Sequence, residues 1–498
     1  MSYVSGLFCV DCNQEYDSKS LPNTCPACGG ILEIHYELEK IGENLSRKKL
    51  RNRPQGIWRY RELLPIRITE NIVTLGEGGT FLHRCDKLAK MIGLRKLYLK
   101  NETTNPTGSF IDRGTAVEVS AVRERGRDSV CSASTGNLAA SLVAYAARAG
   151  LKSKVFIGQR GEFDVGKFYQ ILAFAGSVEI VGSQKEAEKK ASQEAKRSYW
   201  VRSYNPYFME GVKTTFYEVC EQLDWATPDW TFIPMGNGGH LSMTWKGMNE
   251  LLEIGLISSN HAKLVGTQAK DCAPIVDAFE RGSQEIIASA SGSTLAIDIG
   301  VKNPSCGEMA LGAIRKSTGL AYAVSDGEIL RAVKDLARLE GIFVEPASAT
   351  TVASLRELVS DGTIDASETV VCMITGLGLK YPEIARNLVR GRGDLEQLLS
   401  RVEGRRFTTK LGQTKVLILT VLSQNESYGY AIWRSLRDNF GLRSKIPSVY
   451  QHLNELKASG LVRRTRSEET IRKTLRNYYE LTEKGRLTLD QLEKLSSQ

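Results

Sequence analysis

Four cysteines near the beginning of the chain are spaced like metal ligands. Cys9 and Cys12 form one C-x-x-C pair, and Cys25 and Cys28 form a second pair 12 residues later. Four thiolates on two tight turns suit a tetrahedral, structural Zn²⁺ site, since no position is left open for a reacting water. We therefore predict a zinc ribbon over residues 1–38, in which the metal supplies folding energy that so small a unit lacks. A redox dithiol and a metal-free fold are the alternatives.

Three turns rich in Gly, Ser, Thr and Asn follow apolar runs that we interpret as strands. They span residues 134–137, 236–239 and 375–378. Backbone N–H groups at the start of a helix bind anions, and neighbouring hydroxyl and amide groups bind polar ligands. Each turn alone is also ordinary loop chemistry. Together they indicate a site for a small anionic ligand.

The segment that carries these turns alternates strand-like and helix-like patterns. Apolar runs at 96–102, 154–158, 231–236 and 369–376 alternate with helical patterns such as residues 137–150. Near-continuous Val and Ile runs favour parallel strands that helices cover on both faces. We expect an α/β fold with its ligand site at the carboxyl ends of the strands.

The loop Asn105–Gly114, which reads N-P-T-G-S-F-I-D-R-G, leads into a predicted helix with Ile111 at its start. It belongs to an ordered set of motifs: T-L-G-E-G-G-T, N-P-T-G-S-F-x-D-R-G, S-T-G-N, E-G-x-K, G-N-G-G, E-P-A-S-A and T-G-x-G-L-K-x-P. This order resembles threonine synthase, within the fold-type-II family of pyridoxal-phosphate enzymes, over about residues 55–390. The resemblance implies a two-subdomain core of parallel sheets, which we assign to residues 55–392.

The resemblance also implies cofactor-binding roles for eight positions. The phosphate would lie on the turn Gly236, Asn237, Gly238 and Gly239, where His240 replaces the last Asn of the family's motif. Asn137 would contact the phenolic oxygen, Thr375 would face the pyridine nitrogen, and Ser109 belongs to the loop that normally carries the catalytic lysine.

Ile111 stands at the position of that lysine. In the family the lysine amine forms the Schiff base and moves protons at the substrate, as nucleophile and general base. A hydrocarbon side chain offers neither, so we predict no catalytic residue and only noncovalent pyridoxal phosphate, if any is bound. Other departures fall at Phe81, Leu138, Leu377 and Tyr381. The alternative is a displaced lysine, at Lys100, Lys167, Lys213 or Lys380.

The basic excess of the chain is confined to its last fifth. Residues 401–498 hold 19 Lys and Arg against 10 Asp and Glu, whereas residues 1–400 hold 47 of each. Such a confined excess is the electrostatic footprint of a nucleic-acid-binding segment.

After a linker at 393–411, residues 412–498 resemble PadR-type winged-helix regulators, through Y-G-Y, P-S-V-Y, L-x-x-L-x-x-x-G-L-V and Y-Y-x-L-T-x-x-G. The resemblance implies double-stranded DNA as a partner. Base edges would face the start of the helix at 447–459, and the hairpin cations would contact phosphates. The candidates are Ser448, Tyr450, Gln451, Arg463, Arg464, Arg466, Arg472, Lys473 and Arg476. A winged helix used for protein contacts is the alternative.

These patterns favour a ligand-sensing, DNA-binding transcriptional regulator that forms a homodimer. The alternatives are a working threonine synthase, which would convert O-phosphohomoserine to threonine and phosphate under a regulatory tail, and a scaffold without ligand or DNA. No run of about 18 apolar residues and no secretory signal pattern occur, so we expect a cytoplasmic location without membrane contact.

Overall fold

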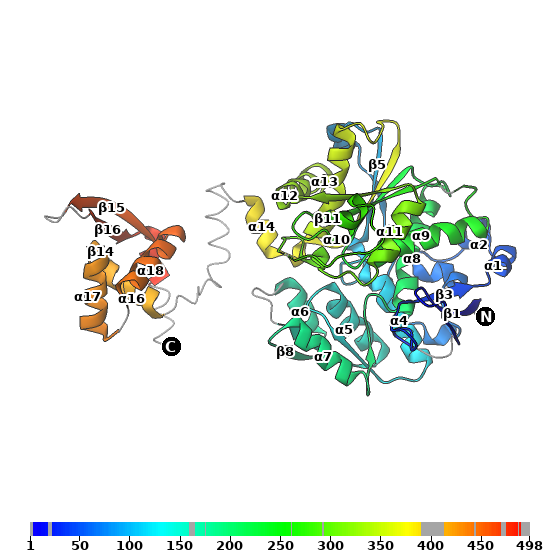
Figure 1. Cartoon of the computed structure of the whole chain (residues 1–498), viewed down its shortest axis with the longest axis horizontal. Coiled ribbons are helices and arrows are strands. Elements are labelled where there is room, and N and C mark those ends of the chain that lie inside the picture. The colour runs from blue at the N-terminus through cyan, green and yellow to red at the C-terminus, as the bar shows by residue number, and fades with distance from the viewer. Residues whose placement is uncertain are drawn as a thin grey trace. The chain divides into compact units, whose positions relative to one another are not determined.

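The computed structural model describes residues 3–17, 22–158, 165–174, 176–259, 261–290, 293–389, 413–442, 445–469, 475–486 and 488–489. The chain divides into two compact units, Met1–Leu388 and Val389–Gln498 (Figure 1). Among the described residues, no helix combines the length and apolar character that crossing a bilayer requires.

The larger sheet of the first unit has the strand order β12-β11-β10-β13-β5-β4. Its strands are parallel except β4, which pairs with β5 in the antiparallel sense. The strands are β4 (Leu82–Arg84), β5 (Lys96–Asn101), β10 (Trp230–Pro234), β11 (Lys263–Ala269), β12 (Leu320–Val324) and β13 (Thr369–Ile374). The helices of this half are α3 (Asp86–Ile92), α9 (Gly239–Glu253), α10 (Pro274–Glu280), α11 (Gly307–Lys316), α12 (Asp326–Asp335), α13 (Pro346–Ser360) and α14 (Pro382–Val389).

The smaller sheet is fully parallel and has the order β8-β7-β6-β9. Its strands are β6 (Ser129–Ala133), β7 (Lys152–Gly158), β8 (Ser177–Val181) and β9 (Tyr199–Trp200). Its helices, α5 (Asn137–Ala149), α6 (Val165–Ala173) and α7 (Gln184–Glu194), group around β8 in Figure 1. Two further helices, α4 (Ile111–Glu124) and α8 (Pro206–Gln222), pack on each other and connect the halves. The predicted α/β core with two subdomains is thus confirmed.

Small residues explain the tight packing of this core. The sequence of α5, N-L-A-A-S-L-V-A-Y-A-A-R-A, lets neighbouring backbones approach closely, and most of the helix is buried. The helix ends at Gly150, whose φ of 71° is a left-handed conformation that favours glycine at a helix C-terminus. Because α5 begins directly after β6, its first turn lies at the carboxyl end of the smaller sheet.

The N-terminal strands belong to the same core. They are β1 (Val4–Cys9), β2 (Glu15–Tyr16) and β3 (Leu32–Tyr36), followed by α1 (Leu38–Asn44) and α2 (Arg47–Arg51). Leu7, Leu32 and Ile34 are fully buried in one cluster with Met248 and Leu251 of α9. The ribbon is therefore not a free-standing unit, and its folding does not rest on a metal alone.

The second unit folds as a winged helix. It contains α16 (Gln413–Gln424), α17 (Gly429–Phe440) and α18 (Ile446–Ala458), with a sheet of β14 (Ser427–Tyr428), β16 (Leu475–Leu481) and β15 (Val462–Glu469). The three helices and the hairpin share a core that includes Ile418, Leu436, Leu453 and Tyr479. This is the architecture that the sequence predicted.

Candidate functional site

A cavity of about 1260 Å³ lies at the carboxyl ends of β6, β10 and β13. Both sheets contribute to it, since parallel α/β folds bind ligands at this edge. Seven of the eight positions assigned to a cofactor line the cavity: Asn137, Gly236, Asn237, Gly238, Gly239, His240 and Thr375. Ser109 does not line it, because its buried hydroxyl accepts a hydrogen bond from Ile111 N at 3.4 Å and shapes the turn.

The turn between β10 and α9 is held in a form that only glycine allows. Gly238 has a φ of 87°, and a Cβ on Gly236 would lie 2.9 Å from the carbonyl oxygen of Asp298. The side-chain amide of Asn237 donates to Ser203 Oγ at 3.2 Å, and its oxygen accepts from Ser305 N at 3.3 Å. The turn therefore delivers the N-terminus of a 15-residue helix to the cavity, an arrangement that attracts anions.

A carboxyl group that the sequence did not single out lies on the opposite wall. Glu345 accepts hydrogen bonds from Thr375 Oγ1 at 2.7 Å and from Asn137 Nδ2 at 3.1 Å. Burial and the negative charge of Asp298 raise the pKa of Glu345 to about 7. This group can hold a proton near neutral pH. The motif E-P-A-S-A was the available signal, since it places Glu345 directly before α13.

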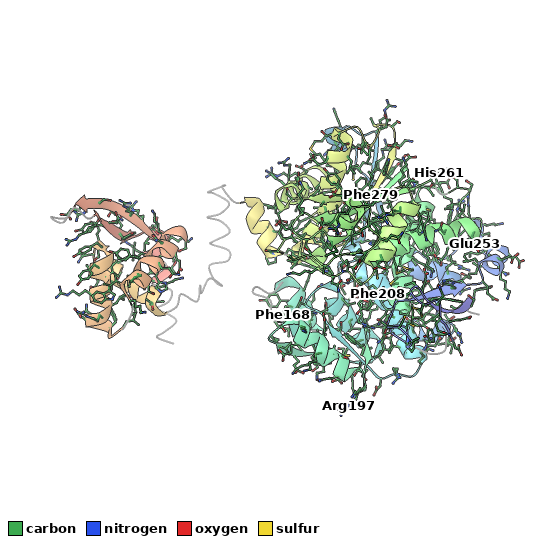
Figure 2. All side chains as sticks on the ribbon, in the orientation of Figure 1. Phe168, Arg197, Phe208, Glu253, His261 and Phe279 are labelled. Carbon is green, nitrogen blue, oxygen red and sulfur yellow. The ribbon has the colours of Figure 1, made fainter. Side chains whose placement is uncertain are left out.

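The wall around Ile111 is apolar. Ile111, Phe208 and Val212 form a buried cluster against which Phe110 and Leu138 pack, and all five side chains line the cavity. Figure 2 labels Phe208 in the interior of the first unit. The position that the resemblance gives to the reactive lysine is therefore part of a hydrocarbon surface.

The four lysines considered as replacements do not line the cavity. Each amine is held by a side chain: Lys100 by Glu218 at 2.7 Å, Lys167 by Asp298 at 2.6 Å, Lys213 by Glu250 at 2.9 Å and Lys380 by Asn137 at 2.7 Å. Within the described part of the chain, Lys302 is the one lysine on the cavity wall. It is exposed, and its amine donates to Ala290 O at 3.3 Å.

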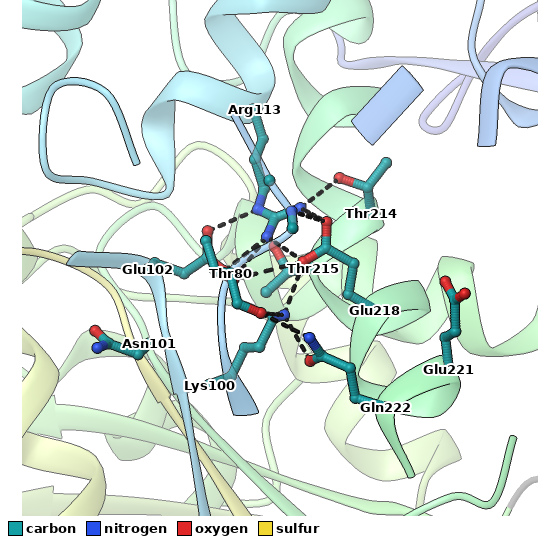
Figure 3. Close-up of polar contacts among 12 residues, drawn as sticks. Thr80, Lys100, Asn101, Glu102, Arg113, Thr214, Thr215, Glu218, Glu221 and Gln222 are labelled. Carbon is teal, nitrogen blue, oxygen red and sulfur yellow. Dashed lines mark hydrogen bonds and ion pairs between the residues drawn. The ribbon is translucent and has the colours of Figure 1, made fainter. Parts of the chain in front are cut away.

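A buried ion network fixes the loop that ends in Ile111 (Figure 3). The guanidinium of Arg113 donates to Glu102 at 2.6 Å and to Glu218 at 2.7 Å, and Lys100 donates to Glu218 at 2.7 Å. All four side chains are at least 95% buried. Burial raises the pKa of Glu102, but the charge of Arg113 outweighs it and holds the pKa below its usual value. The network links β5, α4 and α8, so it positions the loop whatever side chain stands at 111.

Of the further departures from the family pattern, only Leu138 borders the cavity. Phe81 is 65% exposed, and Tyr381 is buried with its hydroxyl against the amine of Lys167. Phe81 and Leu377 do not line the cavity. The case for lost chemistry therefore rests on Ile111 and Leu138.

The four paired cysteines meet in one cluster. Their sulfur atoms all lie within 4.8 Å of one another, with Cys9 and Cys28 at 3.5 Å and Cys12 and Cys25 at 3.6 Å. A tetrahedral ion with Zn–S bonds of about 2.3 Å places its sulfurs about 3.8 Å apart. The cluster thus has the donor chemistry and the spacing of a structural metal site.

Removing metal from this cluster should loosen the ribbon without unfolding the first unit. The reason is that Leu7, Leu32 and Ile34 remain in the same apolar cluster as residues of α8 and α9. After treatment with a chelator, we expect hydrogen exchange to accelerate in residues 5–30 and to stay unchanged in α9. Cooperative unfolding of the whole unit after metal removal would contradict this expectation.

The described DNA-binding candidates lie on two surfaces of the winged helix. Ser448, Tyr450 and Gln451 lie in the first turns of α18, although Tyr450 also packs against Gly429. Arg463, Arg464, Arg466 and Arg476 are exposed on β15 and β16. Arg463 pairs with Glu480, and Arg476 lies 4.8 Å from the ring centre of Tyr428. Arg472 and Lys473 lie outside the described residues.

Comparisons with known proteins agree with the division of the chain into an α/β unit and a winged helix. Residues 73–376 match the family of pyridoxal-phosphate-dependent enzymes, and residues 418–491 match the PadR-like family of transcriptional regulators. A threonine synthase from Methanocaldococcus jannaschii is 44% identical over 380 residues, which cover 76% of this chain and 93% of that protein. A threonine synthase from Methanosarcina acetivorans is 42% identical over 382 residues, which cover 76% and 92%. The structure of a fungal L-serine ammonia-lyase from Rhizomucor miehei is similar to the structure of this chain, with a TM-score of 0.54. The match covers 62% of this chain and 98% of that chain at 20% sequence identity, so it concerns the fold alone.

Proposed function

Because the chain belongs to the pyridoxal-phosphate-dependent enzyme family and carries a PadR-like domain, we propose that it is a ligand-responsive, DNA-binding transcriptional regulator. It is similar to threonine synthases, and Ile111 stands at the position that the resemblance gives to the Schiff-base lysine. The observation that carries the proposal is the apolar wall of Ile111, Leu138, Phe208 and Val212 at the place where the family needs an amine.

Losing this amine removes two catalytic functions at once. A positioned acid–base group contributes about 10²–10⁴-fold to a rate, and the covalent anchor of the cofactor disappears with it. The neighbouring Glu345 can hold a proton, but a carboxyl group forms no Schiff base with an aldehyde. The chain therefore keeps the cavity and gives up threonine formation.

The remaining cavity suits a small anionic ligand, either noncovalent pyridoxal phosphate or an amino-acid phosphate. The phosphate would lie on Gly236–Gly239, and Asn137 and Thr375 would contact the rest of the ligand. Pyridoxal phosphate supplies electron-sink chemistry in enzymes, and in the family the missing amine anchors the cofactor and moves the substrate protons. In the ribbon, Cys9, Cys12, Cys25 and Cys28 would hold a structural Zn²⁺ ion.

The winged helix would read DNA as a homodimer on paired half-sites, in the cytoplasm. A ligand that binds one conformation of the first unit more tightly shifts the protein toward that conformation. The ratio of its affinities for the two conformations limits the size of this shift in population. Ligand and operator affinities are therefore coupled.

DNA binding by the hairpin cations should show a steep dependence on salt. For the double variant R463A/R464A we expect weaker binding to all duplex sequences, with the slope of log K against log salt reduced by about 0.9 for each phosphate that the variant no longer neutralises. Fluorescence anisotropy between about 50 and 200 mM salt measures both slopes. The control is R84A, since Arg84 is exposed but lies in the first unit. An unchanged slope in R463A/R464A would assign this surface to protein contacts.

The competing function is a threonine synthase that uses a different amine, and Lys302 is the observation that favours it. Absorbance and intact mass of protein purified without added cofactor distinguish the two proposals. We expect no aldimine band at about 410–420 nm and no adduct after borohydride. An adduct mapped to Lys302, together with conversion of O-phosphohomoserine to threonine, would establish the enzyme instead. A scaffold that lacks ligand and DNA would show neither the adduct nor the salt-dependent binding.

A further inference from the structure

His240 is a buried side chain that lacks a hydrogen-bonding partner among the described residues. It is 7% exposed and lines the cavity, and neither Nδ1 nor Nε2 has a partner. Burial lowers the pKa of His240 to about 4, so the imidazole is neutral at pH 7 and offers one N–H donor and one acceptor nitrogen. A buried polar group that stays unpaired costs free energy. A ligand in the cavity is the available source of a partner.

His240 lies between an anion-attracting surface and an apolar one. It directly follows Gly239, so it belongs to the first turn of α9, and both residues line the cavity. On its other side its ring stacks on Phe110, with ring centroids 4.5 Å apart and an interplanar angle of 11°. Phe110 in turn packs against Ile111 and Phe208. The N-terminus of α9, the imidazole of His240 and the apolar wall around Ile111 are therefore neighbours in the cavity.

The hydrocarbon wall favours ligands without a positive charge at this position. An ammonium group placed against Ile111, Phe208 and Val212 would lose its hydration and gain no partner there. Three acidic side chains border the cavity: Glu345 accepts a hydrogen bond from Thr375, Asp298 pairs with Lys167 through Oδ1, and the exposed Glu188 accepts from Gln184 at 3.3 Å. None of the three belongs to the apolar cluster of Ile111, Phe208 and Val212. An uncharged ring or chain loses little and buries apolar surface.

We propose that His240 is the specificity-determining residue of the cavity and selects a phosphate ester whose ring carries an alcohol or carbonyl group in place of an ammonium group. The phosphate lies on the N-terminus of α9, an alcohol or carbonyl oxygen accepts the imidazole N–H, and the ring packs on the wall of Ile111, Phe208 and Val212. This inference rests on the ligand-sensing function proposed above and names its ligand class.

Three phosphate esters that differ in one substituent test the selection. Isothermal titration calorimetry of the full-length protein compares pyridoxal 5′-phosphate, pyridoxine 5′-phosphate and pyridoxamine 5′-phosphate, which carry an aldehyde, an alcohol and an amine on the same ring. We expect the aldehyde and the alcohol to bind within about threefold of each other, and the amine to bind at least about tenfold more weakly. Preference for the amine would overturn the proposal.

Variants of His240 separate hydrogen bonding from packing. H240F keeps the stack on Phe110 and removes both nitrogens, so we expect about tenfold weaker binding of the alcohol ester and a thermal midpoint that does not fall. H240N restores a donor and an acceptor and should recover part of the loss. Binding that H240F leaves intact overturns this inference alone. If none of the three esters binds the wild-type protein, both this inference and the ligand-sensing function fail.

Discussion

The variant I111K is expected to bind pyridoxal phosphate covalently, and the wild-type protein is expected not to. Ile111 is the first residue of α4 and lines the cavity, so a lysine there would reach into the same space. Burial lowers the pKa of an amine and leaves more of it unprotonated, the form that attacks an aldehyde. Because the Arg113 network holds the loop independently, the substituted chain should adopt the same backbone.

Absorbance and borohydride reduction measure this gain. We expect a Schiff-base band at about 410–420 nm in I111K, and a reduced adduct on the peptide that contains position 111. Any conversion of O-phosphohomoserine should rise by at least about 10²-fold over the wild-type protein. The matched control is I111M, which has a side chain of similar length and no amine. An equal adduct yield in the wild-type protein and in I111M would show that Ile111 does not decide the chemistry.

R113M should destabilise the first unit more than any surface change. The substitution leaves Glu102 and Glu218 buried beside a single cation, Lys100. Breaking a buried ion pair by removing one partner costs about 3–5 kcal/mol. Urea unfolding of the full chain, followed through the first unit, should show this loss. D86N is the control, because the exposed pair of Arg84 and Asp86 is expected to leave the midpoint unchanged.

The stability difference between R113M and the wild-type protein should depend on pH. In the wild-type protein the pKa values of Glu102 and Glu218 lie below their usual range, so their stabilisation is present at neutral pH and is lost as pH falls through those values. In R113M both carboxyl groups lose their main cation, and burial raises their pKa values. Protonation at lower pH then removes the free-energy cost of burying two unpaired carboxylates. The difference is therefore largest near pH 7 and shrinks toward pH 4. A difference that grows on acidification would contradict this account of the network.

Local sequence patterns predicted the architecture well, because strands, helices and turns are determined largely by short stretches of residues. The turn Gly236–Gly239 lies at the start of a helix, the four cysteines meet, and the C-terminal unit is a winged helix. The ribbon illustrates the limit of such reasoning. The spacing of the cysteines indicated the metal site, but the cluster that buries Leu7 and Ile34 with residues of α8 and α9 joins positions some 200 residues apart in the chain.

Partnerships across long separations account for the features that sequence reasoning missed. In the sequence, Arg113 is recognisable only as one residue of a loop motif. Its partner Glu218 lies 105 residues away, so the ion pair could not be predicted from the motif. The stacking of Phe110 on His240 and the proton-holding Glu345 likewise need the assembled cavity. No property of residues 297–305 in the sequence indicated that Asp298 and Lys302 would border it.

The independence of the Arg113 network from residue 111 has an evolutionary consequence. The ion network holds the loop through Arg113 and not through residue 111. One codon change at position 111 would therefore remove the amine and leave the network in place. The reverse substitution would restore the amine in the same way. Under the proposed function, a protein of this architecture could pass between catalysis and ligand sensing through folded sequences only.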